Sequence, residues 1–289
     1  MARAVMIDGA RVPPEQAAVS VFDRGFLYGD SVFETIRTYG GSPFELDNHL
    51  ARLMRSAEGV FIELPVSTTV LAGEVREAIR AAGNAESYVR VMLTRGTSEL
   101  GIDPSLSVPS LRVIIVAPLV PPPPEAYDHG IGAVTFATRR VADGTAVAGA
   151  KIGNYLVSVL AMRAARAAGA AEALVVDSER RIVEGATSNV FFVERGALVT
   201  PPEEAGILLG ITRSIVLDVA RDLGMGVELR APRTDEVFEE VFISSSIREV
   251  LAVVRLDGAP VGEGSPGPVF RRILAAFRSR VRDMSPPSR

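Results

Sequence analysis

The sequence predicts a two-domain protein of mixed α and β structure (α+β or α/β), and three observations support this class. With 289 residues and 47% hydrophobic content, the chain is long enough for two domains with their own cores. Apolar runs typical of buried strands alternate with stretches of helical spacing. Four consecutive prolines at 121–124 cannot join a sheet ladder and predict a stiff, extended spacer. We therefore expect a small domain at 1–118, a linker at 119–130 and a larger domain at 131–289.

In the first domain, apolar runs predict strands and spaced apolar residues predict helices. The expected strands are Ala4–Ile7, a second near Ala17–Val21, a buried one entered by the loop that begins at Phe22, then Ser87–Thr94 and Leu111–Val116. The expected helices are Asp47–Gly59, with Asp47 as its N-cap, and Thr69–Ala82.

The second domain shows the same alternation after the prolines. Strands are expected near Ala133–Thr138, at Ala173–Val176, at Val190–Val193 and from Val241. Helices are expected at Asn154–Ala168, Ile215–Leu223 and Val269–Val281.

The composition excludes several classes of protein and site. Without cysteine the chain has no disulfide, no thiolate nucleophile and no zinc cluster, which fits a reducing cytoplasm. Its two histidines, His49 and His129, exclude a histidine-rich metal site. A net charge of −4 argues against nucleic acid as the partner. With no signal-like start and no run of membrane-spanning length, we expect a cytoplasmic protein that acts on small molecules.

Lys151 is the only lysine in the chain, because 30 of the 31 basic residues are arginine. Arginine cannot lose its proton in a protein and so cannot form an imine, whereas lysine can once its pKa is lowered. The apolar neighbours of Lys151 disfavour the ammonium form. The count indicates a Schiff base with a carbonyl; the alternative is a solvated surface charge.

Three further stretches suit a ring with a phosphate. Glu184, between apolar neighbours, can hold an aromatic nitrogen protonated, or it can be a turn residue of a hairpin. Ile211 and Thr212 follow a glycine at a predicted helix start, where N–H groups and a hydroxyl bind phosphate, or form an ordinary N-cap. The hydroxyls of 244–246, Ser246 included, are a second set of donors or a polar strand end.

Aromatic and basic residues in the first domain are the remaining candidates. Arg52 lies among apolar residues of a predicted helix, where it is ion-paired, snorkels or holds a phosphate. Tyr88 and Arg90 share a face of a strand and form a carboxylate receptor or a structural pair. Tyr28 and Phe33 can wall a pocket or belong to the core. An imine-forming lysine, a carboxylate and phosphate donors together indicate a pyridoxal phosphate site.

These features resemble one family in order and spacing along nearly the whole chain. The sequence is similar to the fold-type IV pyridoxal phosphate enzymes, which hold branched-chain aminotransferases, D-amino acid aminotransferases and aminodeoxychorismate lyases. The matching stretches are DRGFLYGDSVFETIR (23–37), HLARL (49–53), YVR (88–90), KIGNYL (151–156), IVEGATSN (182–189), GILLGITR (206–213) and GEGSPGP (262–268).

The resemblance implies the fold, the cofactor and the roles of individual residues. It implies a small N-terminal α/β domain and a larger C-terminal domain built on a β-barrel-like sheet with helices. It implies a homodimer or higher homo-oligomer, because in this family the pocket borrows a loop from the partner's small domain. The implied contacts to pyridoxal 5′-phosphate are a Schiff base and proton shuttle from Lys151, a bond from Glu184 to the ring nitrogen, Tyr155 at the ring hydroxyl, and phosphate contacts from Arg52, Ile211, Thr212 and Ser246.

The substrate-binding residues are less sharply matched. We expect Tyr88 and Arg90 to bind the substrate carboxylate, with help from the backbone at Ser246 and Ile247. The YVR, 99–104 and GEGSPGP stretches resemble branched-chain aminotransferases. D-amino acid aminotransferases use an Arg-x-His pair where this chain has Leu100 and Ile102, which cannot bind an anion.

Two positions depart from the branched-chain pattern. Residues 245–249 read Ser-Ser-Ile-Arg-Glu where that group carries Gly-Thr-Ala-Ala-Glu, which is closer to lyase-like members. Thr35 stands where glycine is common before Ile-Arg. Both changes put bulk or charge near the substrate carboxylate and side-chain pocket.

We therefore predict an aminotransferase that moves nitrogen from a hydrophobic, branched-chain-like L-amino acid to 2-oxoglutarate by a ping-pong cycle. The alternatives are a 4-amino-4-deoxychorismate lyase that releases pyruvate, and a D-amino acid or (R)-amine transaminase of the same fold. From a different class, the alternative is a non-catalytic protein that carries the cofactor or serves as an interaction module.

Overall fold

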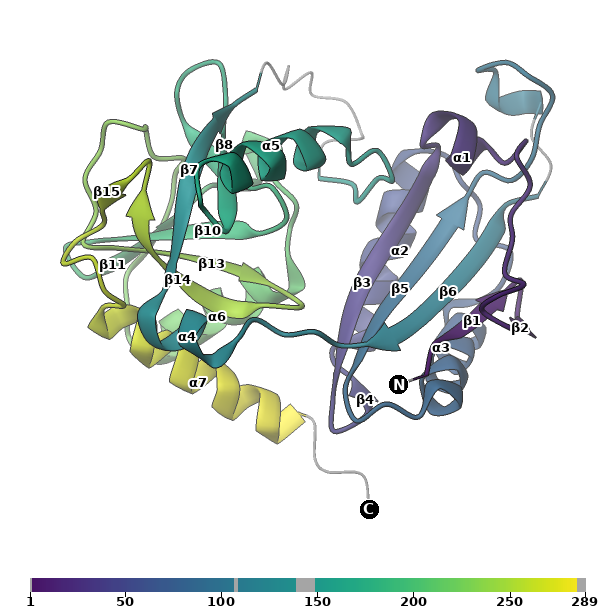
Figure 1. The fold of residues 1–289 in the computed structure, drawn as a ribbon, viewed down its shortest axis with the longest axis horizontal. Helices are drawn as coiled ribbons and strands as arrows, with labels where there is room; N and C mark the ends of the chain where they lie inside the picture. Colours follow the sequence, from purple (N-terminus) through teal and green to yellow (C-terminus); the bar gives the residue numbers. More distant parts are fainter. Residues whose placement is uncertain (1, 107–108, 139–148, 285–289) are drawn as a thin grey trace. The chain divides into compact units, whose positions relative to one another are not determined.

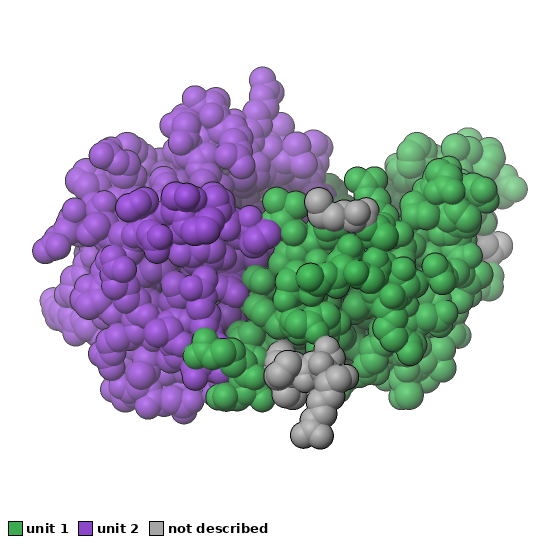
Figure 2. Space-filling view, turned by 60° about the horizontal axis from the view of Figure 1, so that its bottom comes forward, with its two compact units in different colours: residues 1–120, 150–154, 281–289 green, residues 121–149, 155–280 purple. Residues whose placement is uncertain are grey.

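The computed structural model describes residues 2–106, 109–138 and 149–284 (Figure 1). The chain forms two compact units (Figure 2): unit 1 holds Met1–Val120, Ala150–Asn154 and Val281–Arg289, and unit 2 holds Pro121–Gly149 and Tyr155–Arg280. The segment that carries Lys151 therefore belongs to unit 1, although it lies beyond the prolines in sequence. The predicted domain bounds stay a prediction.

Unit 1 is an antiparallel sheet with helices on one face. Its strands are β1 (Ala4–Ile7), β2 (Ala10–Val12), β3 (Ser31–Tyr39), β4 (Ser42–Pro43), β5 (Ser87–Thr94) and β6 (Leu111–Pro118). Its helices are α1 (Arg24–Tyr28), α2 (Leu46–Gly59) and α3 (Thr68–Ala82), with a 3₁₀ turn at Pro104–Leu106. The six strands lie in the order β2-β1-β6-β5-β3-β4.

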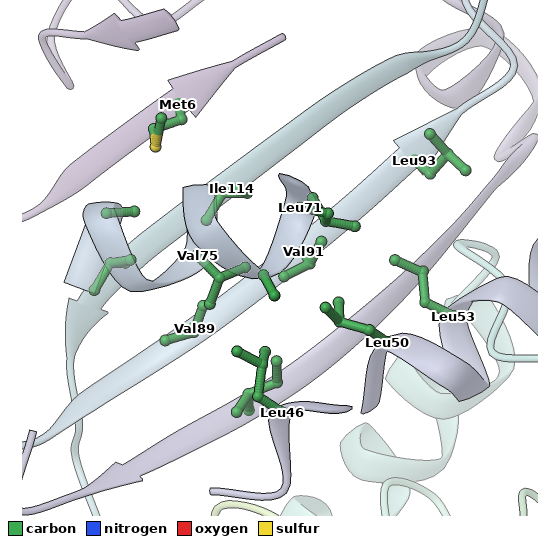
Figure 3. Close-up of a cluster of buried hydrophobic side chains, with 14 of the residues drawn as sticks. Met6, Leu46, Leu50, Leu53, Leu71, Val75, Val89, Val91, Leu93 and Ile114 are labelled. Atoms are coloured by element: carbon green, nitrogen blue, oxygen red, sulfur yellow. The ribbon is translucent and has the colours of Figure 1, made fainter. Parts of the chain in front are cut away.

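The core of unit 1 lies between this sheet and helices α2 and α3 (Figure 3). Val89 and Val91 of β5 point into it and meet Leu50 of α2 and Val75 of α3. The intervening residues of β5 are half-buried, because successive side chains of a strand alternate between its faces. Tyr88 and Arg90 thus share the face away from the helices, as their spacing predicts.

The prediction of a strand near Ala17–Val21 is wrong. The second strand is instead β2, which pairs with β1 through a turn of only two residues, Asp8 and Gly9. Both turn residues have positive φ (49° and 81°), the backbone that matches the twist of a tight hairpin. Residues 17–21 carry no strand pairing.

The predicted N-cap of α2 is also wrong. The helix begins at Leu46 with Glu45 as its N-cap, and Asp47 lies in the first turn. There its carboxylate faces the positive end of the helix dipole, so an acidic residue is favoured at either position.

Unit 2 is built on a larger mixed sheet. Its strands are β7 (Ile131–Ala137), β8 (Glu172–Val176), β9 (Ile182–Gly185), β10 (Asn189–Glu194), β11 (Ala197–Thr200), β12 (Val227–Leu229), β13 (Glu240–Ser245), β14 (Glu249–Leu256) and β15 (Ala259–Pro260). Its helices are α4 (Pro124–His129), α5 (Leu156–Ala167), α6 (Ile211–Asp222) and α7 (Pro268–Met284, in unit 2 as far as Arg280), with a 3₁₀ turn at Glu203–Ala205.

This nine-stranded sheet has the order β12-β11-β10-β13-β14-β7-β8-β9, with β15 paired to β14, and it curls into the expected barrel-like form. Strands β7 and β8 are parallel, and α5 lies on the connection between them. Strand β9 runs antiparallel to β8, with Glu184 opposite Val175. Glu184 therefore lies on a strand and not in a turn.

The spacer expected over the four prolines is only partly extended. Residues 119–123 have no regular structure, but Pro124 begins α4, with Pro123 as its N-cap. Proline is favoured in the first helical turn because its missing N–H would have no partner there and its φ already suits a helix. Among the described residues, no helix is long and apolar enough to cross a membrane, and no group of side chains could hold a metal ion. The cytoplasmic location stays a prediction.

Candidate functional site

The backbone around Lys151 is fixed by both the sheet and a helix of unit 1. Ile152 forms an antiparallel bridge with Val32 of β3. The N–H of Phe33 donates to the Lys151 carbonyl over 3.0 Å, and the Lys151 N–H donates to Ser56 Oγ of α2 over 3.1 Å. The lysine therefore extends from a short segment paired with β3, although more than a hundred residues separate them in sequence.

The Lys151 amine lies against an aromatic ring. Its Nζ is 4.7 Å from the centre of the Phe33 ring, and the Arg90 guanidinium carbon is 3.8 Å from the same centre. Phe33 is only 1% exposed. The face of an aromatic ring attracts a nearby cation, although the ring carries no negative charge. The Phe33 ring therefore holds the lysine in place without forming an ion pair with it.

Gly153 makes this approach possible. A Cβ at this position would overlap Ser31 Oγ of β3, so any side chain would push the segment away from the strand. The Gly153 N–H donates to the Ser31 carbonyl over 2.7 Å. The glycine in KIGNYL thus keeps the lysine segment paired to β3.

Arg52 forms a buried ion pair inside unit 1. Its Nε and Nη2 each lie 2.7 Å from one of the two carboxylate oxygens of Glu34, whose side chain is 0% exposed. His49 Nδ1 lies 2.7 Å from Glu34 Oε2. A bidentate arginine and an imidazole together satisfy a carboxylate that has no access to water.

The charges in this Arg52–Glu34–His49 trio follow from their surroundings. Burial raises the pKa of the Glu34 carboxyl, but the hydrogen bonds and charge of Arg52 outweigh it and lower that pKa to about 2. Burial lowers the pKa of His49, which favours its neutral form. Because a carboxylate only accepts hydrogen bonds, the hydrogen of neutral His49 lies on Nδ1.

Arg52 was a candidate from the sequence, but its two partners were missed. Glu34 and His49 both lie in stretches that carry the family resemblance. His49 and Arg52 are three residues apart and so lie on one face of α2, which is a signal that they share a partner. Glu34, a charged residue inside the apolar run of a predicted strand, was the second signal.

The structure separates the two predicted pocket aromatics. Phe33 lies beside Lys151 and Arg90. Tyr28 ends α1 and is 40% exposed, and its hydroxyl accepts the N–H of Gly101 over 3.1 Å. Tyr28 is therefore attached to the loop that follows β5.

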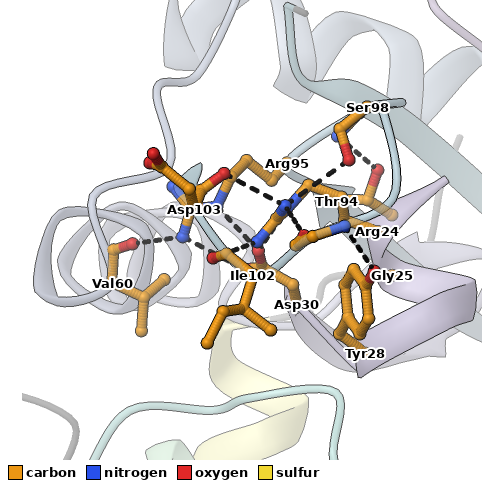
Figure 4. A network of polar contacts seen from close by, with 12 residues as sticks. Arg24, Gly25, Tyr28, Asp30, Val60, Thr94, Arg95, Ser98, Ile102 and Asp103 are labelled. Carbon is orange, nitrogen blue, oxygen red and sulfur yellow. Dashed lines mark hydrogen bonds and ion pairs between the residues drawn. The ribbon is translucent and has the colours of Figure 1, made fainter. Parts of the chain in front are cut away.

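That loop is held by a network centred on Arg24 (Figure 4). Arg24 donates to the carbonyls of Gly101 (2.9 Å) and Ile102 (3.0 Å), and its Nε pairs with Asp30 at 2.9 Å. Arg95 also pairs with Asp30, at 2.7 Å. Burial raises the pKa of Asp30, but bonds from the two arginines outweigh it and leave that pKa below its usual range. No sequence pattern indicated this network.

The side chains on the loop point into solvent. Leu100 is 72% exposed and Ile102 is 83% exposed in a single copy of the chain. A loop whose carbonyls are held by a buried arginine while its apolar side chains are exposed is suited to burial against another surface.

In unit 2, Glu184 is held by the chain that leads to α6. Its Oε2 accepts the N–H of Leu208 over 3.2 Å. Asn189 at the start of β10 donates to the Leu208 carbonyl over 2.7 Å. Leu208 thus links the strand of Glu184 to the residues just before α6.

The start of α6 offers donors for an anion. Its N-cap is Gly210, which has no side chain to accept the first N–H groups, and Ile211 and Thr212 form its first turn. A Cβ on Gly210 would overlap Asn189 Oδ1, so this position excludes a capping side chain. Backbone N–H groups and the hydroxyl of the buried residue Thr212 (4% exposed) at the positive end of a helix suit a phosphate.

The other predicted residues of unit 2 occupy ends of elements. Tyr155 is the residue before α5 and is half-buried. Ser246 and Ile247 form the turn between β13 and β14 and are half-buried. The geometry gives their positions, and their roles stay predictions.

The chain is similar to aminotransferases over both units. The family model described as amino-transferase class IV matches residues 31–256. A putative branched-chain-amino-acid aminotransferase from Methanocaldococcus jannaschii is 35% identical over 277 residues, 95% of each chain. A D-alanine aminotransferase from Bacillus licheniformis is 30% identical over 96% of each chain. The crystal structure of a T.th. branched-chain amino acid aminotransferase with pyridoxamine 5′-phosphate superposes with a TM-score of 0.92, at 33% identity over 99% of this chain and 96% of that one.

Proposed function

Because the chain belongs to the class IV aminotransferases, which use pyridoxal 5′-phosphate, we propose that it moves an amino group from a hydrophobic, branched-chain-like L-amino acid to 2-oxoglutarate. Lys151 is the observation that carries this proposal. It is the only amine-bearing side chain in the sequence, and its backbone is fixed between β3 and α2. In the proposed ping-pong cycle the enzyme reacts first with the amino donor and then with the acceptor, and it ends in its starting form. This cycle needs one side-chain amine that can hold the cofactor.

Pyridoxal 5′-phosphate, when bound, would supply an aldehyde carbon for an amine and a ring that accepts the electron pair left when the substrate carbon loses its proton. We assign to Lys151 the attachment of the cofactor and the movement of a proton at the substrate carbon. We assign to Glu184 a hydrogen bond that keeps the ring nitrogen protonated. Tyr155 is proposed to contact the ring hydroxyl.

Four residues are proposed to hold the phosphate: Arg52, Ile211, Thr212 and Ser246. Arg52 brings directed N–H donors, but its charge is already balanced by Glu34, so it adds little net positive charge. The N–H groups at the start of α6 add the positive end of a helix dipole. Backbone donors orient a phosphate without a competing counter-ion.

Substrate selection is proposed to rest on the face of unit 1 that lies away from the helices. Arg90 and Tyr88 share this face and bring a cation and a hydroxyl for a carboxylate, with help from the Ile247 backbone. Phe33 and Tyr28 are proposed to contact the side chain of the substrate. The apolar Leu100 and Ile102 favour L-amino acids over D-amino acids, because an anion-binding pair stands there in D-specific members.

We further propose a homodimer or higher homo-oligomer. The rigidly held loop of unit 1 exposes Leu100 and Ile102, and helix α5 of unit 2 exposes Leu156 (64%), Val159 (59%) and Leu160 (45%). Side chains of this size at helical spacing are usually buried by a partner. Light scattering of the purified protein is expected to give at least twice the mass of one chain.

A half-reaction screen tests the function. The cofactor's absorbance band should shift on adding L-leucine and return on adding 2-oxoglutarate, with glutamate formed. A shift with D-alanine or (R)-amines but not with L-leucine would support the D-amino acid or (R)-amine alternative. Pyruvate from 4-amino-4-deoxychorismate without glutamate would support the lyase. No shift with any amine donor would contradict transamination and favour a non-catalytic cofactor carrier.

A further inference from the structure

Arg248 stands in the stretch where this chain departs from branched-chain aminotransferases, in the turn between β13 and β14. Its Nη2 lies 2.5 Å from Glu172 Oε2 and 2.7 Å from Thr187 Oγ1. Its Nε lies 3.4 Å from Ser245 Oγ, and its own N–H donates to the same oxygen over 3.3 Å. The guanidinium thus folds back over the turn that contains Ser246.

The partner of Arg248 is a carboxylate held at both oxygens. Glu172 begins β8 and its side chain is 0% exposed. Its Oε2 also accepts from Ser188 Oγ over 2.9 Å, and its Oε1 accepts from the Ala173 N–H over 2.9 Å. A Cβ on Gly185 would approach the Glu172 carboxylate to 3.3 Å, so the surroundings are close-packed. A fixed, buried carboxylate is a rigid anchor for the arginine that pairs with it.

The arginine is held from its backbone as well. The Tyr127 hydroxyl of α4 donates to the Arg248 carbonyl over 3.2 Å. The side chain of Arg248 is 18% exposed, well below the exposure of a surface ion pair. Arg248 therefore links the turn between β13 and β14 to the start of β8 through Glu172, and to the turn 186–188 through Thr187.

We propose that Arg248 is a positioning residue: through Glu172 it fixes the turn whose Ser246 holds the cofactor phosphate. The inference rests on the phosphate role assigned to Ser246 under the proposed function. Arg248 acts on the phosphate only through this turn, so its removal is expected to weaken contacts to the phosphate and leave contacts to the ring unchanged.

Titration of the apo-protein with pyridoxal 5′-phosphate and with pyridoxal, which lacks the phosphate, tests this. Arg248→Met is expected to weaken binding of pyridoxal 5′-phosphate about tenfold, the effect of losing one charge-assisted hydrogen bond, and to leave pyridoxal binding within about twofold. Equal weakening of both ligands, or no weakening of either, would overturn the proposal, because a purely structural role cannot distinguish them.

The double variant Glu172→Gln with Arg248→Met keeps the test available should the single variant fail to fold. Glutamine keeps an acceptor for Ser188 and removes the unpaired buried charge, while the turn stays untethered, so the same phosphate-specific loss is expected. Arg255→Met is the matched control, since this β14 arginine bonds the nearby Gly258 carbonyl at 3.2 Å and its loss should leave binding of both ligands unchanged. If the wild type bound neither ligand, the proposed function would fail first.

Discussion

Two buried arginine–carboxylate pairs, one in each unit, differ in how completely the arginine encloses its partner. In unit 1, Arg52 donates hydrogen bonds to both carboxylate oxygens of Glu34, and His49 makes a third contact with this carboxylate. In unit 2, Arg248 reaches Glu172 with one nitrogen and shares that nitrogen with a hydroxyl. Both carboxylates are 0% exposed. The first pair lies between a sheet and a helix, and the second joins a turn to the start of a strand, β8.

This difference indicates that the two pairs have different roles. A bidentate pair in a core has little freedom, and its loss leaves a charge with no access to water. A single-nitrogen pair beside a half-buried turn can admit water when it is broken. We therefore expect the Arg52 pair to dominate stability and the Arg248 pair to dominate the placement of a turn.

The largest effect is expected for Arg52→Met. The variant leaves the Glu34 carboxylate buried with only His49 beside it, and the free energy of unfolding should fall by about 3–5 kcal/mol. Urea unfolding of the apo-protein measures this. Arg55→Met, at an exposed position of the same helix, is the control and should stay within about 0.5 kcal/mol of wild type. Equal stability of the two variants would break the comparison.

Arg248→Met is expected to cost less, about 1–3 kcal/mol, because Glu172 keeps bonds from Ser188 and from a backbone N–H. The same urea experiment gives this value. A loss larger than that of Arg52→Met would show that the number of arginine nitrogens on the carboxylate does not set the cost.

The dependence of stability on pH should report the charge states of Glu34 and His49 in unit 1. The pKa of Glu34 falls from 4.5 to about 2 on folding, so its stabilisation is complete above pH 4.5 and is lost as the pH falls toward 2. The lowered pKa of His49 acts in the same direction, with stability lost as the pH falls below 6.5. Urea midpoints between pH 7 and pH 3 should drop more steeply for wild type than for Glu34→Gln. Parallel curves would contradict this assignment.

The smallest effect is expected for Ser188→Ala. It removes one of the bonds to Glu172 while Arg248 stays in place, so the cost should be about 1 kcal/mol. Ser214→Ala, on the exposed face of α6, serves as the control and should not change the urea midpoint. A cost as large as that of Arg248→Met would mean that the hydroxyl, and not the arginine, supports the carboxylate.

Sequence patterns predicted the helices, strands and candidate residues that depend on positions close together in the chain. The spacing of apolar residues predicted α2, α3 and α5 with small shifts at their ends, and the apolar run of Ser87–Thr94 predicted β5 without error. Lysine count and motif order identified Lys151, Arg52 and Glu184 as candidates.

Long-range pairing could not be predicted in this way. Arg248 and Glu172 are 76 residues apart, and nothing in either neighbourhood marks the other as its partner. Strand β2 was missed because it has only three residues, Ala10–Val12, which are exposed or half-buried and so show no apolar pattern. The placement of Lys151 in unit 1 depends on the bridge between its neighbour Ile152 and Val32 of β3.

The attachment of the cofactor to Lys151 tests the central claim most directly. Since the chain has no other lysine, borohydride reduction with pyridoxal 5′-phosphate should fix one cofactor on the peptide that contains Lys151, as read by mass spectrometry. The Lys151→Ala variant should carry none on the corresponding peptide. A wild-type protein that stays unlabelled at Lys151, or an equally labelled alanine variant, would contradict the account.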